Sequence, residues 1–318
     1  TKQRQGSGGP VSIIEVANLL KTYDGVNVVD RVSFSVDEGE IFGIVGPNGA
    51  GKTTTVECVE GLRHPDGGSI HVLGLDPIRD RYEITERLGA QLQESRLQDK
   101  ITVGEALDLY ASFYRNPADW HDLLSRLGLQ EKVNSKYAKL SGGQKQRLAI
   151  ALALVGSPEV AILDELTTGL DPQARRSTWD TIEEIRSGGV TVVLVTHFME
   201  EAERLCDRIM VIDHGRVVAI DTPSGLIRGI GSEQRLTFRP SETINDEAIE
   251  NLPDVTTIDH RGSHVVITGT SNVVQAVTAQ LAGLGVIAED LRVEQTSLED
   301  AYLELTSGDP DEAEPEAN

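Results

Sequence analysis

The sequence predicts an α/β fold with a mostly parallel sheet, followed by a small α+β domain. Short apolar runs with strand character alternate with amphipathic helical patterns, which is typical of a parallel sheet covered by helices on both faces. A glycine-rich loop joins one further apolar run to a helix. A glycine-rich break in composition at about 222–231 then marks the start of the second domain.

Antiparallel strands are expected before the glycine-rich loop. Apolar and polar residues alternate over 12–36 around a turn at Gly25 and Val26. The next run, 41–45, reads I-F-G-I-V and suits a buried parallel strand, and residues 53–62 fit a helix. Residues 1–12 are predicted to form a flexible leader, because they begin with a polar, glycine-rich stretch.

A helical segment is expected at about 94–157, within a domain that covers residues 13–225. Apolar residues recur there with i, i+3, i+4 spacing over 104–114, 120–127 and 142–154. Strand patterns then return at 160–163, 190–195 and 208–213, separated by helical patterns at 172–186 and 199–205.

Residues 232–306 predict the small α+β domain. Strands are expected at 234–238, 255–259, 264–268 and 286–293, with a helix at 273–284. Residues 307–318 are rich in carboxylates and proline, and predict a disordered acidic tail.

Composition excludes several classes of protein. The formal net charge of −22 disfavours nucleic acid as a partner, because nucleic acid attracts cationic surfaces. No run approaches the roughly 18 apolar residues that cross a bilayer, and no signal-peptide pattern opens the chain. Cys58 and Cys206 lie far apart and show no metal or disulfide spacing. We therefore expect a cytosolic protein.

The glycine-rich loop carries a phosphate-binding motif. Residues 46–53 read G-P-N-G-A-G-K-T and match G-x-x-x-x-G-K-[ST] between a strand and a helix. Backbone N–H groups and the helix dipole converge at such a turn and favour an anion. L-S-G-G-Q-K-Q-R-L follows at 140–148 and A-I-L-D-E at 161–165. Together the three segments predict ATP binding and hydrolysis.

These segments resemble those of the nucleotide-binding subunit of an ATP-binding-cassette (ABC) transporter, over about residues 14–222. L-S-G-G-Q is the specific element, since other P-loop NTPases lack it. The resemblance implies a P-loop NTPase cassette with a mixed sheet core, an antiparallel β-subdomain and a helical subdomain. It also implies head-to-tail pairing, with each ATP between the P-loop of one subunit and the L-S-G-G-Q of the other. The ending S-L-E-D-A-Y-L-E-L-T at 297–306 resembles that of daunorubicin-resistance-type drug exporter ATPases.

The resemblance assigns the phosphate and metal contacts. Lys52 is expected on the β- and γ-phosphates, Thr53 on Mg²⁺ and Thr54 on the α-phosphate. Asp164 ends an apolar run and offers Mg²⁺ a carboxylate. The rest of the loop is expected to surround the ATP: Gly46, Pro47, Asn48, Gly49, Ala50 and Gly51.

Three residues are expected at the γ-phosphate. Glu165 is implied as the general base or water-positioning group, and strand alternation is expected to aim it away from Asp164. Gln93 is implied as a contact to Mg²⁺ and the attacking water, with Gln91 as a competing candidate. His197 follows an apolar strand and matches a histidine that contacts the γ-phosphate; the alternative is an ordinary surface or core histidine.

Other expected ATP contacts have local structural alternatives. Asp171 resembles an aspartate at the dimer interface, but it also suits an N-cap for a helix starting at Pro172. Tyr23 is expected to stack on adenine, the alternative being plain packing. The signature residues are expected to offer a helix N-terminus to the partner's γ-phosphate, with Ser141 also able to cap that helix: Ser141, Gly142, Gly143 and Gln144.

The resemblance therefore implies an ATPase subunit at the cytoplasmic face of the membrane, paired as a homodimer and bound to a separate membrane-spanning permease. Drug export is the expected function, and an importer subunit or a soluble ABC ATPase acting on ribosomes or DNA are the alternatives. Leu166 departs from the family, which usually has proline there, and this puts the geometry of the following loop in doubt. The sequence of a cassette does not identify the transported compound, because a cassette contacts ATP and the permease and never the transported compound.

Overall fold

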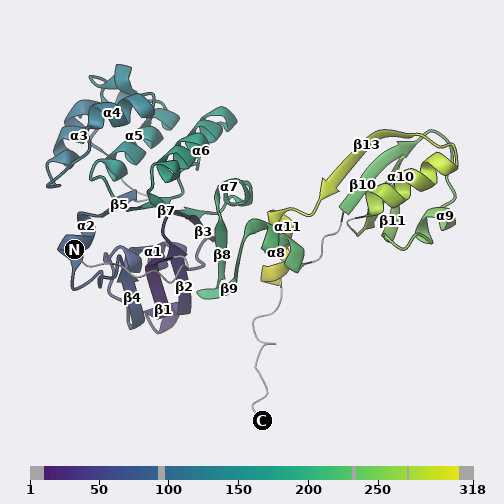
Figure 1. The fold of residues 1–318 in the computed structure, drawn as a ribbon, viewed down its shortest axis with the longest axis horizontal. Helices are drawn as coiled ribbons and strands as arrows, with labels where there is room; N and C mark the ends of the chain where they lie inside the picture. The colour runs from purple at the N-terminus through teal and green to yellow at the C-terminus, as the bar shows by residue number, and fades with distance from the viewer. Residues whose placement is uncertain (1–10, 92–96, 231–233, 271, 308–318) are drawn as a thin grey trace, which may run out of the picture. The chain divides into compact units, whose positions relative to one another are not determined.

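The computed structural model describes residues 11–91, 97–230, 234–270 and 272–307 (Figure 1). The chain divides into two compact units, Thr1–Pro223 and Ser224–Asn318. Of the expected leader, residues 1–10 lie outside the described residues, and Ser12 already belongs to the first strand. Of the expected acidic tail, all but Ser307 lies outside them.

Six strands form the central sheet of the first unit, in the order β5-β6-β7-β3-β8-β9. Neighbouring strands run parallel except β9, which is antiparallel to β8. Every residue of β3 (Ile41–Val45), β6 (Val160–Asp164) and β7 (Thr191–Thr196) is buried, as expected of parallel strands covered on both faces. The other strands are β5 (Leu88–Gln91), β8 (Arg208–Asp213) and β9 (Arg216–Asp221).

A second, antiparallel sheet has the order β2-β1-β4. Its strands are β1 (Ser12–Tyr23), β2 (Val26–Asp37) and β4 (Gly67–Val72). Asp24 and Gly25 join β1 to β2 with φ of 48° and 81°. Two residues with positive φ suit a tight hairpin, so the turn lies one residue earlier than the sequence predicted.

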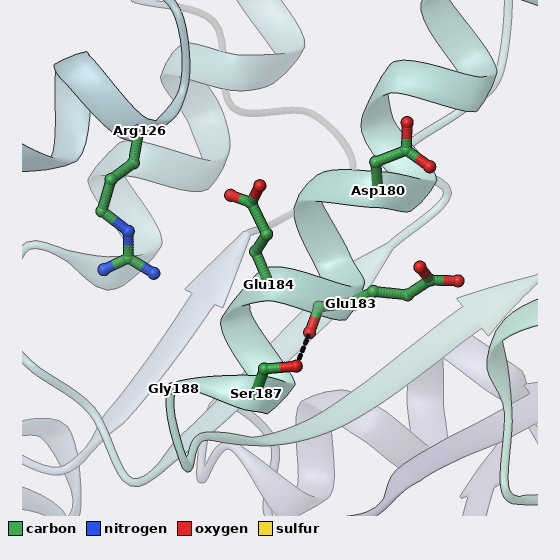
Figure 2. Close-up of a pocket in the computed structure, with 6 residues that line it drawn as sticks. All are labelled: Arg126, Asp180, Glu183, Glu184, Ser187 and Gly188. Carbon is green, nitrogen blue, oxygen red and sulfur yellow. Dashed lines mark hydrogen bonds between the residues drawn. The ribbon is translucent and has the colours of Figure 1, made fainter.

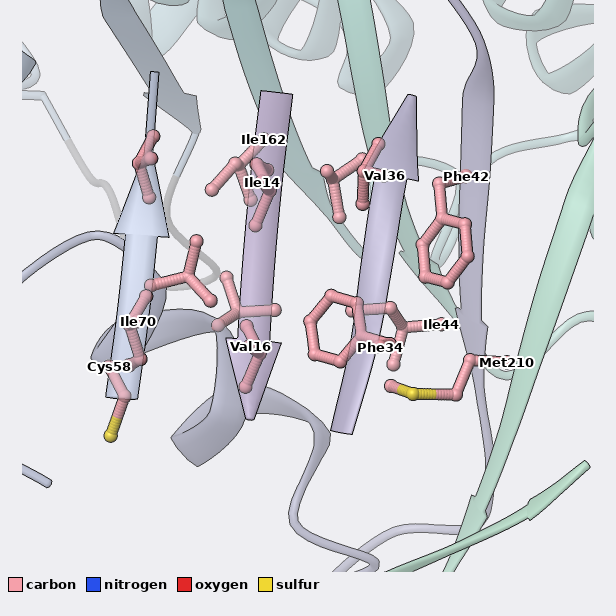
Figure 3. Packing of buried hydrophobic residues seen from close by; sticks show 14 of the residues in the cluster. Ile14, Val16, Phe34, Val36, Phe42, Ile44, Cys58, Ile70, Ile162 and Met210 are labelled. Atoms are coloured by element: carbon pink, nitrogen blue, oxygen red, sulfur yellow. The ribbon is translucent and has the colours of Figure 1, made fainter. Parts of the chain in front are cut away.

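One hydrophobic core fills the space between the two sheets and helix α1 (Lys52–Val59). Figure 3 shows Phe34 of β2 beside Phe42 of β3, and their rings stack with centroids 5.5 Å apart. Cys58 of α1 is fully buried in the same cluster. Burying a large apolar side chain contributes about 1.5–3 kcal/mol, so this core holds α1 and the loop before it against rigid strands.

The predicted helical segment contains α3 (Val103–Ala111), α4 (Trp120–Arg126) and α5 (Gly142–Leu154), with α3 and α4 both packed on α5. Thr102 and Glu105 form a capping box, so α3 begins one residue before the predicted start and ends three before the predicted end. The remaining helices of this unit are α2 (Arg81–Thr85), α6 (Pro172–Ser187) and α7 (Met199–Leu205), with 3₁₀ turns at Gln130–Lys132 and Tyr137–Lys139. Within the described ranges, no helix has the length and apolar character needed to cross a membrane.

The second unit contains a four-stranded antiparallel sheet in the order β11-β12-β10-β13. Helix α10 (Val273–Gly283) packs onto it around Leu236 and Phe238. The predicted strand at 286–293 begins two residues late, because Val286 joins this core ahead of the strand. The strands are β10 (Gln234–Pro240), β11 (Val255–Arg261), β12 (His264–Gly269) and β13 (Ala288–Gln295). Its other helices are α9 (Glu247–Glu250) and α11 (Leu298–Ser307), and α8 (Pro223–Gly229) forms within the composition break.

Candidate functional site

A cavity of about 260 Å³ lies where the loop after β3 meets the start of α1. It is lined by Val28, Asn48, Gly49, Gly51, Lys52, Thr53, Thr54 and Glu165. The loop requires glycine at two points. A Cβ on Gly46 would lie 2.2 Å from the Ile212 carbonyl oxygen, and one on Gly51, where φ is 96°, would lie 2.5 Å from that of Val28. The backbone is therefore packed closely here, and a tight glycine-rich turn before a helix is the kind of segment whose N–H groups bind an anion.

Lys52 is buried beneath the loop. Its Nζ donates hydrogen bonds to the carbonyl oxygens of Gly46 at 2.8 Å and Pro47 at 2.9 Å. Burial lowers the pKa of Lys52, and the charges of Glu165 and Asp164 partly oppose this. A buried ammonium beside an open cavity favours a ligand that brings negative charge, such as a phosphate.

Asp164 ends β6 and is almost fully buried, with 5% of its surface exposed. Burial, with Glu165 next in size, raises the pKa of Asp164 to about 6, while a hydrogen bond with the Thr53 side chain lowers it. Its Oδ1 has no hydrogen-bond partner among the described atoms. An orphaned carboxylate oxygen beside a threonine hydroxyl fits a hard cation such as Mg²⁺.

Protein side chains alone do not complete a metal site. Over the described ranges, no group of three or more His, Cys, Asp or Glu residues is arranged to hold an ion. Mg²⁺ commonly takes one or two protein ligands and fills its shell with phosphate oxygens and water. Thr53 and Asp164 fit that smaller set.

Glu165 lies outside the strand that Asp164 ends. Its φ of 49° is left-handed, and its N–H donates to the Val195 carbonyl oxygen at 2.9 Å. This left-handed turn takes Glu165 out of the extended strand conformation, so strand alternation does not set the direction of its side chain. The Glu165 Oε1 lies 3.2 Å from Nδ1 of His197, which follows β7. The parallel sheet thus brings together two residues 32 positions apart in sequence.

The first glutamine candidate, Gln93, lies outside the described residues. Its competitor Gln91 is described at the end of β5, where it is 9% exposed. Its Oε1 accepts a hydrogen bond from the Asp164 N–H at 3.3 Å. Gln91 therefore links the β5 edge to the strand end that carries the carboxylates.

The signature residues do not line the phosphate cavity of their own chain. Ser141 Oγ accepts from the Gln144 N–H at 3.3 Å, and Gln144 Oε1 accepts from the Ser141 N–H at 3.0 Å. This capping box starts α5. Gly142 and Gly143 occupy its first turn, so the N-terminus of α5 offers a backbone that little side-chain bulk covers.

Asp171 caps α6, as its structural alternative predicted. Oδ1 accepts from the N–H groups of Gln173 at 3.0 Å and Ala174 at 2.9 Å.

In the loop before Asp171, Leu166 is fully buried, and the Thr168 N–H donates to the Glu165 carbonyl oxygen at 3.3 Å. The buried Leu166 side chain thus anchors this loop in the core, at the position where the family usually has proline.

Tyr23 lies at the end of β1 and does not line the phosphate cavity. Its hydroxyl accepts a hydrogen bond from Arg63 Nη1 at 2.8 Å.

Sequence reasoning missed Val28, which reaches the cavity from β2, and Glu60, a buried carboxyl at the end of α1. Burial, with the charge of Asp164 next, raises the pKa of Glu60 to about 8. Neither residue belongs to a motif, so only the fold reveals them.

A larger cavity, of about 610 Å³, lies between α4 and α6 and is distant in sequence from the glycine-rich loop. Figure 2 shows Arg126 of α4 facing Glu184 of α6, with Asp180 and Glu183 turned to other sides. Three carboxylates with one arginine suit neither phosphate nor a nucleotide base. The smaller cavity is the better candidate for the functional site, because a lysine, a carboxylate and the glycine-rich loop converge on it.

Known proteins resemble this chain in sequence and in fold. Residues 29–168 match the ABC transporter family. The Nod factor export ATP-binding protein I of Burkholderia lata is 42% identical over 246 residues, covering 75% of this chain and 81% of that protein. A solved ATP-binding subunit of an ABC transporter has a TM-score of 0.63 at 31% identity, covering 69% of this chain and 93% of the other. A dimeric bacterial ABC transporter cassette has a TM-score of 0.59 at 28% identity, covering 66% and 98%.

Proposed function

This chain belongs to the ABC transporter family as an ATP-binding subunit with ATPase activity, and from that premise we propose that it powers export of drugs or other hydrophobic compounds through a separate membrane-spanning permease. The B. lata relative is named for export, which supports that direction of transport. In this proposal the subunit is peripheral, held at the cytoplasmic face of the membrane by the permease.

One observation carries the catalytic part of the proposal: the segments that follow three neighbouring parallel strands bring a lysine, two carboxylates and a histidine close together. Lys52 begins α1, after β3, while Asp164 ends β6 and Glu165 follows it directly. His197, after β7, contacts Glu165. Phosphoryl transfer needs positioning and charge neutralisation more than covalent chemistry, and this arrangement supplies both.

We assign each side chain one role in the hydrolysis of ATP to ADP and phosphate. Lys52 neutralises the β- and γ-phosphates. Glu165 orients a water and accepts its proton while His197 holds the carboxylate and contacts the γ-phosphate. Thr53 and Asp164 hold Mg²⁺, which neutralises phosphate charge when bound, and Gln93 is proposed to reach the same ion.

A second copy of the chain is proposed to complete the site. The N-terminus of α5 carries Ser141 and lies outside the cavity of its own subunit, although L-S-G-G-Q is suited to a phosphate. Head-to-tail pairing places that helix end, and the loop at Asp171, on the partner's ATP. The solved cassette that is dimeric supports pairing in this family.

Mixing two inactive variants is expected to restore activity. Lys52→Ala and Ser141→Arg both damage the same composite site in a mixed dimer, so the other site keeps an intact loop and an intact signature. Random pairing makes half of the dimers mixed, with one of two sites intact, so roughly a quarter of the parental ATPase rate should return. The rate is measured as a function of mixing ratio.

Each variant alone serves as the control and should stay inactive. If mixing restores no activity while both variants still fold and associate, the head-to-tail arrangement is wrong. Turnover by dilute, monomeric parent protein would contradict it as well.

Transport is tested in inverted membrane vesicles that contain the co-purified permease. ATP-dependent accumulation of a hydrophobic fluorescent drug inside such vesicles is the expected result, because export in the cell becomes uptake there. Vesicles with Glu165→Gln protein provide the control. ATP-driven loss of preloaded compound would instead indicate an importer.

A further inference from the structure

Tyr23 is held by a set of polar contacts that belong to none of the phosphate-binding motifs. Arg63 Nη1 donates to its hydroxyl at 2.8 Å, and the Arg63 guanidinium carbon lies 5.7 Å from the ring centroid. Lys21 Nζ lies 5.4 Å from the same centroid. Cations at these distances interact favourably with an aromatic ring. The position of the ring is therefore set by neighbours as well as by the strand.

Arg63 is in turn tied to α1. Its guanidinium pairs with Glu57, through Nε to Oε2 and through Nη2 to Oε1 at 3.3 Å. Its backbone N–H donates to the Glu57 carbonyl oxygen at 3.0 Å. Glu57 lies on the helix that begins with Lys52. The phosphate-binding helix and the tyrosine thus share one arginine.

The loop between α1 and β4 also holds the strand that carries Tyr23. Asp66 accepts a hydrogen bond from the Thr22 N–H at 2.7 Å and one from Lys21 Nζ at 3.0 Å. The Asp66 N–H donates to the Leu20 carbonyl oxygen at 2.8 Å. The side chains of Asp66 and Arg63, both in this loop, therefore bond to neighbouring residues at the end of β1, and Arg63 contacts the Tyr23 side chain.

We propose that Arg63 is a positioning residue for nucleotide binding, which orients the Tyr23 ring to stack on adenine and ties that ring to the helix that binds the phosphates. The inference rests on the proposed function, to which we add the adenine contact that the family resemblance implies for Tyr23. Arg63 acts through Tyr23 and does not contact the phosphates. Its loss should weaken binding of a nucleotide with a base and leave binding of a chain of phosphates unchanged.

The test compares ATP with inorganic tripolyphosphate, which carries phosphates and no base. Arg63→Met keeps an unbranched side chain and removes the charge and all donors. We expect its dissociation constant for ATP to rise roughly three- to tenfold, with kcat unchanged at saturating ATP. The dissociation constant for tripolyphosphate should equal that of the parent protein. Arg63→Lys, which keeps a cation and a donor, should recover part of the loss.

A double-mutant cycle identifies the contact responsible. Tyr23→Phe removes the hydroxyl that accepts from Arg63 and keeps the ring. It should weaken ATP binding in the same direction. The double variant should lose less affinity than the product of the two single losses, because both changes break the Arg63–Tyr23 hydrogen bond, while Arg63→Met also removes the cation beside the ring. Independent, multiplying losses would overturn the proposal.

Arg204 provides a matched control. Its side chain is 41% exposed, against 42% for Arg63. It also pairs with carboxylates, Asp180 and Glu183, and lies over an aromatic ring, that of Trp179. Arg204→Met should leave both dissociation constants unchanged. Equal weakening of ATP and tripolyphosphate binding by Arg63→Met would show a general structural role and overturn the inference.

Tyr23→Ala separates failure of the inference from failure of its premise. If Tyr23→Ala binds ATP as tightly as the parent, the proposed adenine contact is wrong and the inference falls with it. If Tyr23→Ala weakens ATP binding and Arg63→Met does not, the adenine contact stands and the positioning role of Arg63 is refuted.

Discussion

Replacing Glu165 with glutamine is expected to stop ATP turnover while ATP still binds. Glutamine keeps the size of the side chain and removes the carboxylate that orients water and accepts its proton. Losing a general base of this kind slows the chemical step by roughly 10²–10⁴-fold. Single-turnover hydrolysis and the dissociation constant for ATP, measured on the same protein, check both halves of the expectation.

The structure explains why Glu165, and not the neighbouring Asp164, is expected to act on the water. Glu165 lines the phosphate cavity and contacts His197, whereas Asp164 beside it is buried and suits the metal. Glu159→Gln is the control and should leave ATP turnover unchanged. Glu159 directly precedes the first residue of β6, at the end of the strand away from Asp164, and pairs with Arg87. Hydrolysis at a near-parental rate in Glu165→Gln would remove Glu165 from the chemistry.

Lys52→Ala is expected to fail one step earlier, at binding of the nucleotide. Lys52 is 6% exposed, and the phosphates would bring several negative charges next to Asp164 and Glu165. Removing one member of a buried charge pair costs about 2–5 kcal/mol, which corresponds to a dissociation constant raised on the order of 10²-fold or more. Equilibrium titration with ATP measures the change.

A folding control is needed for Lys52→Ala, because Lys52 also bonds to the carbonyl oxygens of Gly46 and Pro47. Thermal unfolding identifies a variant that has lost its structure. Lys136→Ala removes an exposed lysine far along the chain from the loop and should bind ATP normally. An unchanged dissociation constant in folded Lys52→Ala protein would show that another group binds the phosphates.

The α/β class and the phosphate-binding motif could be predicted from the sequence alone. Both depend on short-range patterns: a run of five apolar residues at Ile41–Val45, then glycines where the backbone must turn tightly. Helix ends were predicted correctly for α5 and α7, and less well for α3. Thr102 starts α3 through a capping box with Glu105, a local pattern separate from the apolar spacing, and the helix at Val103–Ala111 is shorter than that spacing predicted.

Tertiary structure decided how the chemical groups meet. Pairing of β6 with β7 in parallel register brings Glu165 to His197, and a left-handed backbone at Glu165, which no local pattern shows, takes this residue out of the strand conformation. The structure alone identifies Val28 and Arg63 as site residues. Val28 of β2 lines the cavity beside the glycine-rich loop, and Arg63, in the loop before β4, contacts Tyr23. Local sequence encodes backbone conformation over a few residues, whereas contacts between distant residues arise when burial of the shared core fixes how the sheets pack.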